Sequence, residues 1–229
     1  MLNNAIDHSS GDSVVVQIIK TAVLTDIMIY DNGEGIFNKI KRELGLLDER
    51  QAILELSKGK LTTDPKRHTG EGIFFSSRMM DDYAILSGKT YFSHQNIKDA
   101  DWILERQKFQ NGTGVFMKLK NNTTRETKKI INRYTSDDDY GFTKTIVPVR
   151  LAQYGDESLV SRSQAKRLLS RIDRFKTVIL DFEGIRSIGQ AFADEIFRVF
   201  TLSNKEINFL HINANKDVEQ MIMHAILNR

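Results

Sequence analysis

The spacing of hydrophobic residues along this chain switches between the period of a strand and that of a helix. Residues 1–8 have helical spacing and begin without a capping residue, and the apolar runs Val14–Ile19 and Ala22–Tyr30 predict two strands. We expect these strands to form an antiparallel pair. Helical spacing returns over Ile36–Leu47, and a second short helix is predicted over Glu49–Ser57.

A polar segment, Lys58–Glu71, follows these helices. It is longer than a typical connection, and long ordered loops are often lids or binding loops, so it is a candidate for such a role. Helical spacing restarts at Gly72. Beyond this helix the pattern predicts four strands, separated in part by glycine-containing turns such as Asn111-Gly112: Tyr83–Leu86, Thr90–Ser93, Trp102–Gln107 and Thr113–Leu119.

The second half of the chain shows the clearer periodicity. Residues 121–142 are polar and mixed in charge, so we interpret them as an inter-domain linker with a short helix within Arg125–Tyr134. Ser161 and Gln164 have the spacing of a capping box at a helix start. Further helices are predicted over Gln190–Phe200 and Asp217–Leu227, and strands over Thr145–Val149 with the residues before Gln153, Thr177–Phe182 and Ile207–Ile212.

Strands that alternate with helices in this way imply a small α/β domain with parallel pairing. The chain is therefore predicted to hold two α/β domains, residues 1–120 and 143–229, joined by the linker 121–142. At 229 residues, either domain is large enough to bury a core.

Composition narrows the function classes. The chain is 40% hydrophobic and 28% charged, which is typical of a folded protein. Its net charge of +3 is small and its basic residues are interleaved with 30 acidic ones, so neither nucleic acid nor a membrane is an expected partner. The absence of cysteine excludes disulfides and thiolate metal sites and fits a cytoplasmic protein. No apolar run has the length of a transmembrane helix, and residues 1–8 lack a signal-peptide pattern.

The stretch Ile27–Ile36 carries the first candidate chemistry. Its apolar half, Ile27–Tyr30, is typical of a buried strand and ends in Asp31-Asn-Gly33-Glu-Gly35. A carboxylate at the end of a strand can accept a hydrogen bond from an amino group of a ligand, and the glycines let that ligand approach the main chain. Alone, this D-x-G-x-G pattern is weak, because many tight strand-to-helix turns share it.

Three further motifs accompany this stretch. Asn3-Asn4-Ala5 places amides on the helix that precedes the strand pair. Thr69-Gly70-Glu-Gly72 is a glycine turn that opens a helix, where free backbone N–H groups and the helix dipole favour phosphate. Gly112-Thr113-Gly begins a late strand. In this order the four motifs resemble the GHKL ATP-binding family, which includes gyrase, Hsp90, histidine kinases, MutL and the anti-sigma-factor kinases.

The resemblance covers residues 1 to about 120 and implies an α+β sandwich that binds ATP with Mg²⁺. It implies that Asn4 holds Mg²⁺ against the phosphates and that Asp31 accepts from the adenine amino group. The remaining site residues that it implies are the two glycines of the pocket floor, the second glycine pair at the triphosphate and a threonine near the adenine: Gly33, Gly35, Gly70, Gly72 and Thr113. Lys66, Arg67 and His68 in the long polar segment are additional candidates for phosphate contact.

The chain departs from the family pattern at one position. Family members that hydrolyse ATP, and many kinases, carry a glutamate four residues before the asparagine as general base. Here that position falls immediately before Met1. Either this is a nucleotide binder without the base, or the sequence begins inside a longer protein. The uncapped start favours the second interpretation, so we expect an N-terminally shortened domain.

The second half also has a resemblance. Val178–Glu195 is similar to the STAS-like domain of anti-sigma-factor antagonists, in which a phosphorylatable serine opens the helix after a strand and turn. Gln190 and Ala191 occupy that position here and Ser187 lies on the wrong side of the turn, so the phosphorylation switch does not carry over. The segment 143–229 is more similar to a divergent STAS-like domain of unknown function that is fused to GHKL modules.

These resemblances imply an ATP- and Mg²⁺-binding regulatory protein, in which the nucleotide switches a GHKL-like domain coupled to a STAS-like domain. Two alternatives stay open. One is an active anti-sigma-type protein kinase or ATPase whose base lies upstream of Met1, and the other is a non-catalytic protein-interaction module. A protein partner is expected in each case, and a homodimer stays open.

Overall fold

The computed structural model describes residues 1–62, 70–98, 100–136, 139–155 and 157–227. Its internal contacts divide the chain into two compact units, Met1–Asn132 and Arg133–Arg229. The boundary falls inside the segment 121–142 that we interpreted as a linker. That segment contains α5 (Thr127–Arg133) and the short hairpin of β5 (Thr135–Ser136) and β6 (Asp139–Phe142).

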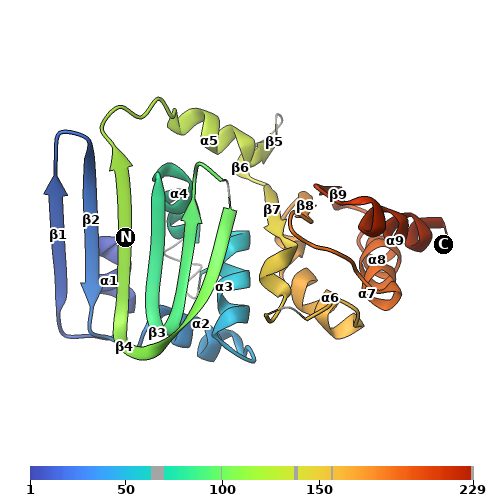
Figure 1. Ribbon diagram of the computed structural model, residues 1–229, viewed down its shortest axis with the longest axis horizontal. Coiled ribbons are helices and arrows are strands. Elements are labelled where there is room, and N and C mark those ends of the chain that lie inside the picture. The colour runs from blue at the N-terminus through green and yellow to red at the C-terminus, as the bar shows by residue number, and fades with distance from the viewer. Residues whose placement is uncertain (63–69, 99, 137–138, 156, 228–229) are drawn as a thin grey trace. The chain divides into compact units, whose positions relative to one another are not determined.

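The first unit is built on a four-stranded antiparallel sheet in the order β1-β2-β4-β3 (Figure 1). β1 (Val14–Lys20) and β2 (Leu24–Asp31) form the predicted antiparallel pair. β1 lies at one edge, and β2 pairs on its other side with β4 (Ala100–Lys120), which in turn pairs with β3 (Asp82–Gln95).

The prediction of four separate strands between Tyr83 and Leu119 was wrong. The segment forms two long strands, β3 and β4, and Asn111-Gly112 lies inside β4 instead of in a turn. The register shifts on both sides of Gly88, and Gly88 and Gly112 have positive φ angles of 60° and 69°. Glycines in this conformation accommodate an irregularity inside a strand, and in the sequence such positions look like turns.

Helices cover one face of this sheet (Figure 1): α1 (Leu2–His8), α2 (Ile36–Leu44), α3 (Glu49–Lys58) and α4 (Gly72–Met79). α2 ends at Leu44, three residues before the predicted end at Leu47, because the next residue, Gly45, takes the left-handed conformation of a helix cap. α3 includes Lys58, which we had assigned to the polar segment; its ammonium is buried against Glu55 at 2.7 Å. The core lies between helices and sheet and includes Phe37, Ile40, Ile53, Ile85, Phe92 and Val115.

The second unit contains a three-stranded parallel sheet, as predicted, in the order β7-β8-β9. The strands are β7 (Lys144–Pro148), β8 (Thr177–Asp181) and β9 (Asn208–Ile212). The residues before Gln153 are not a strand: η1 (Val149–Ala152) is a 3₁₀ turn, because Pro148 has no N–H with which to extend the ladder.

The helices of this unit are α6 (Arg162–Leu169), α7 (Gln190–Asp194), α8 (Thr201–Ser203) and α9 (Lys216–Leu227), with a short 3₁₀ turn η2 (Ile172–Arg174). The predicted capping box is present: Ser161 Oγ accepts from the Gln164 N–H at 3.2 Å, and Gln164 Oε1 accepts from the Ser161 N–H at 2.8 Å. Between α7 and α8 the helix widens to a π-helix, Glu195–Phe200. Among the described residues no helix is long and apolar enough to span a bilayer.

Candidate functional site

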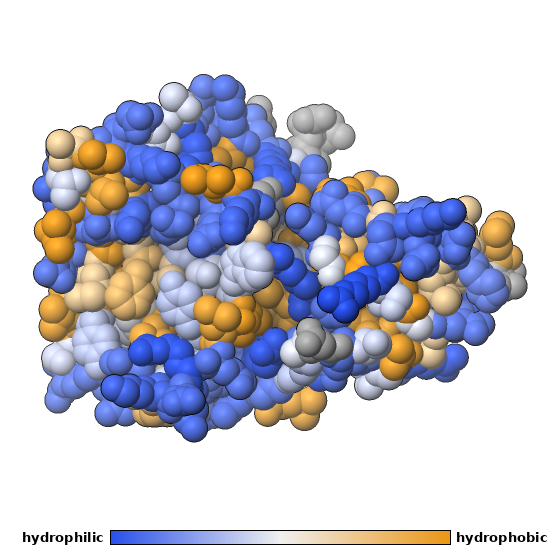
Figure 2. Space-filling view, viewed as in Figure 1, coloured by the Kyte–Doolittle hydropathy of each residue, from blue (hydrophilic) through white to orange (hydrophobic). Residues whose placement is uncertain are grey.

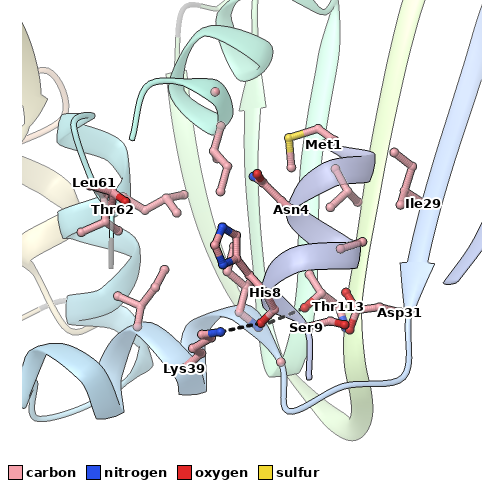
Figure 3. A pocket seen from close by; sticks show the side chains of 18 of the residues that line it. Met1, Asn4, His8, Ser9, Ile29, Asp31, Lys39, Leu61, Thr62 and Thr113 are labelled. Atoms are coloured by element: carbon pink, nitrogen blue, oxygen red, sulfur yellow. Dashed lines mark hydrogen bonds between the residues drawn. The ribbon is translucent and has the colours of Figure 1, made fainter. Parts of the chain in front are cut away.

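A cavity of about 390 Å³ lies in the first unit between the sheet and its helices (Figure 3). Six of the seven residues predicted from the motifs line it, although they come from α1, β2, β4, the turn before α2 and the region where α4 begins: Asn4, Asp31, Gly35, Gly70, Gly72 and Thr113. The seventh, Gly33, is not among the lining residues. Lys66, Arg67 and His68 lie outside the described residues.

Asp31 is the last residue of β2 and is 4% exposed. Its Oδ1 accepts two backbone hydrogen bonds, from Gly33 N–H at 3.0 Å and from Thr113 N–H at 3.1 Å. Its Oδ2 has no hydrogen-bond partner among the residues that the structure describes. The two N–H donors therefore fix the carboxylate and leave one of its oxygens as an acceptor for a ligand in the cavity.

The glycine turn after Asp31 holds α2 in place. A side chain at Gly33 would overlap the Ser9 carbonyl, and Glu34 N–H donates to that same carbonyl at 3.0 Å. Gly33 is thus needed for contact with the end of α1. Gly35 has φ of 86°, and Ile36 N–H, at the start of α2, donates to Thr113 Oγ1 at 3.0 Å. The start of α2 is in this way connected to β4 through the Thr113 side chain.

α1 presents one face to the cavity. Met1, Asn4, Ala5 and His8 recur at the spacing of one helical face, and all four line the cavity. In Figure 3 the Asn4 side chain points into the cavity. No described residue forms a hydrogen bond with this side chain, so its amide oxygen is free to accept from or coordinate a ligand.

Gly70 and Gly72 line the cavity near the start of α4. The first N–H groups of a helix lack intrahelical partners, and the helix dipole makes this end attractive to anions. A methyl group added at Gly72 would meet no atom within 4 Å. Unlike Gly33, this glycine is not required by the packing of the protein itself.

Lys39 is a cavity residue that the motifs did not predict. Its Nζ donates to the His8 carbonyl at 2.7 Å (Figure 3) and lies 3.9 Å from Glu43. It is the one lysine or arginine among the described residues that line the cavity. The signal was available in the sequence, because Lys39 follows Ile36 by three residues and therefore lies on the same face of α2.

The residues present fit the ATP and Mg²⁺ that the sequence resemblance implies. The cavity volume lies in the range of small-molecule sites. Asp31 Oδ2 is a buried acceptor for an amino group, the Asn4 amide oxygen suits Mg²⁺, which prefers oxygen ligands, and Lys39 supplies a positive charge for phosphate.

Comparisons with known proteins bear mainly on the second unit. Residues 164–219 match the family model of a STAS-like domain of unknown function (DUF4325). This match confirms the STAS-like resemblance within the predicted second domain. A search of curated proteins found no match.

Among solved structures, the chain is similar to the 43K ATPase domain of Thermus thermophilus gyrase B, solved in complex with an aminocoumarin. The sequence identity is 16%, the TM-score is 0.33, and the match covers 58% of this chain and 36% of that chain. Gyrase is one of the proteins of the family that residues 1–120 resemble. A similarity this low adds nothing to what the cavity residues themselves indicate.

Proposed function

We propose that the first unit binds ATP with Mg²⁺ in the cavity and that Asp31 recognises the adenine. One observation carries the proposal: a buried carboxylate whose Oδ1 is held by two backbone N–H groups while its Oδ2 has no partner among the described residues. A fixed carboxylate oxygen accepts a hydrogen bond from the exocyclic amino group of adenine. Because the carboxylate is already oriented, little entropy is lost when the base binds.

The phosphates then lie toward the other lining residues. Lys39 contacts phosphate oxygens in place of, or in addition to, the His8 carbonyl, and the first N–H groups of α4 donate hydrogen bonds to further phosphate oxygens. Asn4 supplies an oxygen ligand to Mg²⁺. When bound, Mg²⁺ neutralises part of the phosphate charge, so the affinity for ATP depends on Mg²⁺ and on the Asn4 side chain that holds it.

The second part of the proposal is that ATP regulates the STAS-like unit. The chain joins a candidate nucleotide site to a unit whose residues 164–219 match a STAS-like domain. A ligand shifts a conformational equilibrium only by binding one state more tightly than the other. We therefore propose that ATP changes the stability or the partner binding of the second unit, and that the partner is a protein.

Calorimetric titration with ATP and Mg²⁺ tests the binding site. Asp31→Asn is expected to abolish adenine recognition, because an amide that presents its N–H₂ group to the adenine amino group repels it. Asp26→Asn is the matched control: Asp26 is on the same strand, is 43% exposed and pairs with Lys118 at 3.8 Å on the face of the sheet away from the cavity. Equal ATP affinity in wild type and Asp31→Asn would refute the site.

A second ligand isolates the adenine contact. The triphosphate of unsubstituted purine riboside lacks the exocyclic amino group and should bind wild type more weakly than ATP does. Asp31→Asn should remove that preference. If both proteins prefer ATP equally, the carboxylate does not recognise the amino group, even if the nucleotide occupies the cavity.

Hydrogen exchange tests the regulatory part. Amides within residues 164–219 are expected to change their protection when ATP and Mg²⁺ are added to wild type, and not when they are added to Asp31→Asn. Protection that changes only within residues 1–132 would leave ATP binding in place and refute the coupling. Phosphate release, followed in the same samples, separates a binder from an ATPase.

A further inference from the structure

The free edge of β1 is unprotected. β1 pairs with β2 on one side, and no described residue pairs with it on the other side (Figure 1). Its apolar side chains are exposed on both faces: Val15 and Ile19 are 53% and 49% exposed, and Val16 and Ile18 are 46% and 63% exposed. An apolar strand with unpaired N–H and C=O groups is a template for another strand.

β3, the strand at the opposite edge of the same sheet, has features that prevent pairing with a second chain. β3 has register shifts on both sides of Gly88, and the charged residues Asp82 and Lys89 lie along it. Irregularities and charges of this kind keep a strand edge from pairing with a second chain. β1 has no register shift, and from Val14 to Ile19 it contains no charge, no glycine and no proline; its one charged residue, Lys20, is at its end.

We propose that β1 pairs with β1 of a second copy of this chain, antiparallel about Gln17, to form one continuous eight-stranded sheet. In this register Val16 lies opposite the partner's Ile18, Val15 lies opposite the partner's Ile19, and all seven residues of each strand are paired. The two-fold axis is perpendicular to the sheet, so the helices of both copies lie on the same side. Pairs of β-branched residues directly across an antiparallel ladder stabilise it.

Charge complementarity supports a second copy as the occupant. In the proposed register Lys20 lies opposite the partner's Val14, at the end of the ladder where the partner's chain enters β1 from Asp12. Asp12 lies in a bend two residues before the strand, and its Oδ1 accepts from Asn32 Nδ2 at 2.6 Å, which holds this carboxylate beside the end of β1. Lys20 has no ion pair among the described residues, and the two-fold axis repeats the contact at the other end of the ladder.

The first helix adds apolar surface on the same face of the sheet. α1 packs on β2, with Ala5 buried in the core and Asn4 and His8 directed to the cavity. Helical periodicity places Leu2 and Ile6 on the side of α1 away from the cavity, where they are 41% and 61% exposed. Val16 and Ile18 are exposed on the helix-bearing face too, so a second copy brings additional apolar residues together there.

A single cysteine tests both the dimer and its register, because the chain has none of its own. Gln17→Cys places one thiol directly opposite itself across the two-fold axis, at a separation that a disulfide can bridge. Under mild oxidation this variant is expected to form a covalent dimer. Ile19→Cys alone should not, because its partner across the ladder is Val15, whereas the double variant Val15→Cys/Ile19→Cys should.

Sedimentation velocity of the full chain gives the second readout. Wild type is expected to sediment as a dimer and Ile18→Lys as a monomer, because a charge then enters the centre of the apolar ladder. Leu47→Lys is the control: Leu47 is 77% exposed and lies outside the sheet. A cooperative thermal unfolding transition of Ile18→Lys, which is 63% exposed in the single chain, shows that the monomer is folded.

Three outcomes would overturn the proposal. Wild type could remain a monomer at high concentration, the dimer could persist in Ile18→Lys, or Ile19→Cys could cross-link as well as Gln17→Cys. None of the substituted β1 residues lines the cavity. The dimer can therefore be confirmed or refuted whether or not the protein binds ATP.

Discussion

The carboxylate of Asp31 and the main chain of Thr113 hold each other in place across 82 residues of sequence. Asp31 Oδ1 accepts from the Thr113 N–H at 3.1 Å, and Thr113 Oγ1 accepts from the Ile36 N–H at 3.0 Å. β2, β4 and α2 therefore meet at one point on the cavity wall. Thr113 thus helps to orient Asp31, the proposed adenine acceptor, without having to contact the base itself.

The Thr113 hydroxyl is expected to orient α2. Thr113→Val keeps the shape of the side chain and the backbone donor to Asp31 but leaves the Ile36 N–H without its acceptor, which should cost about 1–3 kcal/mol of unfolding free energy. ATP affinity should fall with it, because Lys39 is carried by the same helix. Thr113→Ser retains the hydroxyl and should recover most of both. Denaturant unfolding and ATP titration measure the two effects, and a fully stable Thr113→Val would contradict this role.

The two glycine turns are expected to respond differently to alanine. A side chain at Gly72 meets open space within the first turn of α4, so Gly72→Ala should leave the free protein stable or up to about 1 kcal/mol more stable. ATP affinity should nevertheless fall, since the added methyl occupies cavity volume. Gly33→Ala should lose stability in the absence of any ligand, because its methyl overlaps the Ser9 carbonyl. If Gly72→Ala binds ATP as tightly as wild type does, the start of α4 does not contact the phosphates.

Lys39 is expected to contact phosphate and not the base. Lys39→Met retains most of the aliphatic side chain and removes the charge, so ATP affinity should fall about tenfold or more, the cost of one hydrogen bond to a charged group. Adenosine affinity should not change. Lys41→Met, on the same helix but outside the cavity lining, is the control. Parallel losses of ATP and adenosine affinity would instead show that Lys39 supports the fold of the cavity.

Much of the cavity could be predicted from sequence because its residues belong to ordered motifs. Asn4, Asp31 and Thr113 were chosen for their place in those motifs, and they line one cavity although they are distant in sequence. Their role in nucleotide binding stays a prediction. Gly33 is a different case: it belongs to the same motif, but its close approach to Ser9 is a tertiary contact that no local pattern contains.

The misassigned elements have physical causes of the same kind. Gly88 and Gly112 interrupt the alternation of β3 and β4, yet the ladder of hydrogen bonds to neighbouring strands continues past them. Pairing across the sheet outweighs the local preference of a glycine for a turn. Lys58 was assigned to a loop because it is charged, whereas its pairing with Glu55 satisfies the charge inside the helix layer. The strand partners of Gly88 and Gly112 are distant in sequence, whereas Glu55 and Lys58 form an i,i+3 pair whose spacing is present in the sequence and was overlooked.

Acid should destabilise the first unit through Asp81. Arg125 Nη1 donates to Asp81 Oδ1 at 2.9 Å and the Lys120 N–H donates to Oδ2 at 2.6 Å, which attaches the segment after β4 to the start of β3. The hydrogen bond from the Arg125 guanidinium, with the backbone donor and the nearby charges, holds the pKa of Asp81 below its ordinary value of 3.8. A carboxylate whose pKa is lower in the folded state stabilises the fold above its unfolded-state pKa and loses that contribution as pH falls through the folded-state value.

Asp81→Asn is therefore expected to be less stable than wild type by about 1–2 kcal/mol at pH 7, the contribution of hydrogen bonds to a charged acceptor at a largely buried position. The difference should remain constant down to about pH 4 and shrink below it, because the wild-type carboxylate then becomes protonated. Denaturant unfolding of both proteins between pH 7 and pH 3 measures it. Asp82→Asn, at an exposed neighbouring position, should show no such dependence. A difference that stays the same at pH 3 would mean that Asp81 acts through its shape and not through its charge.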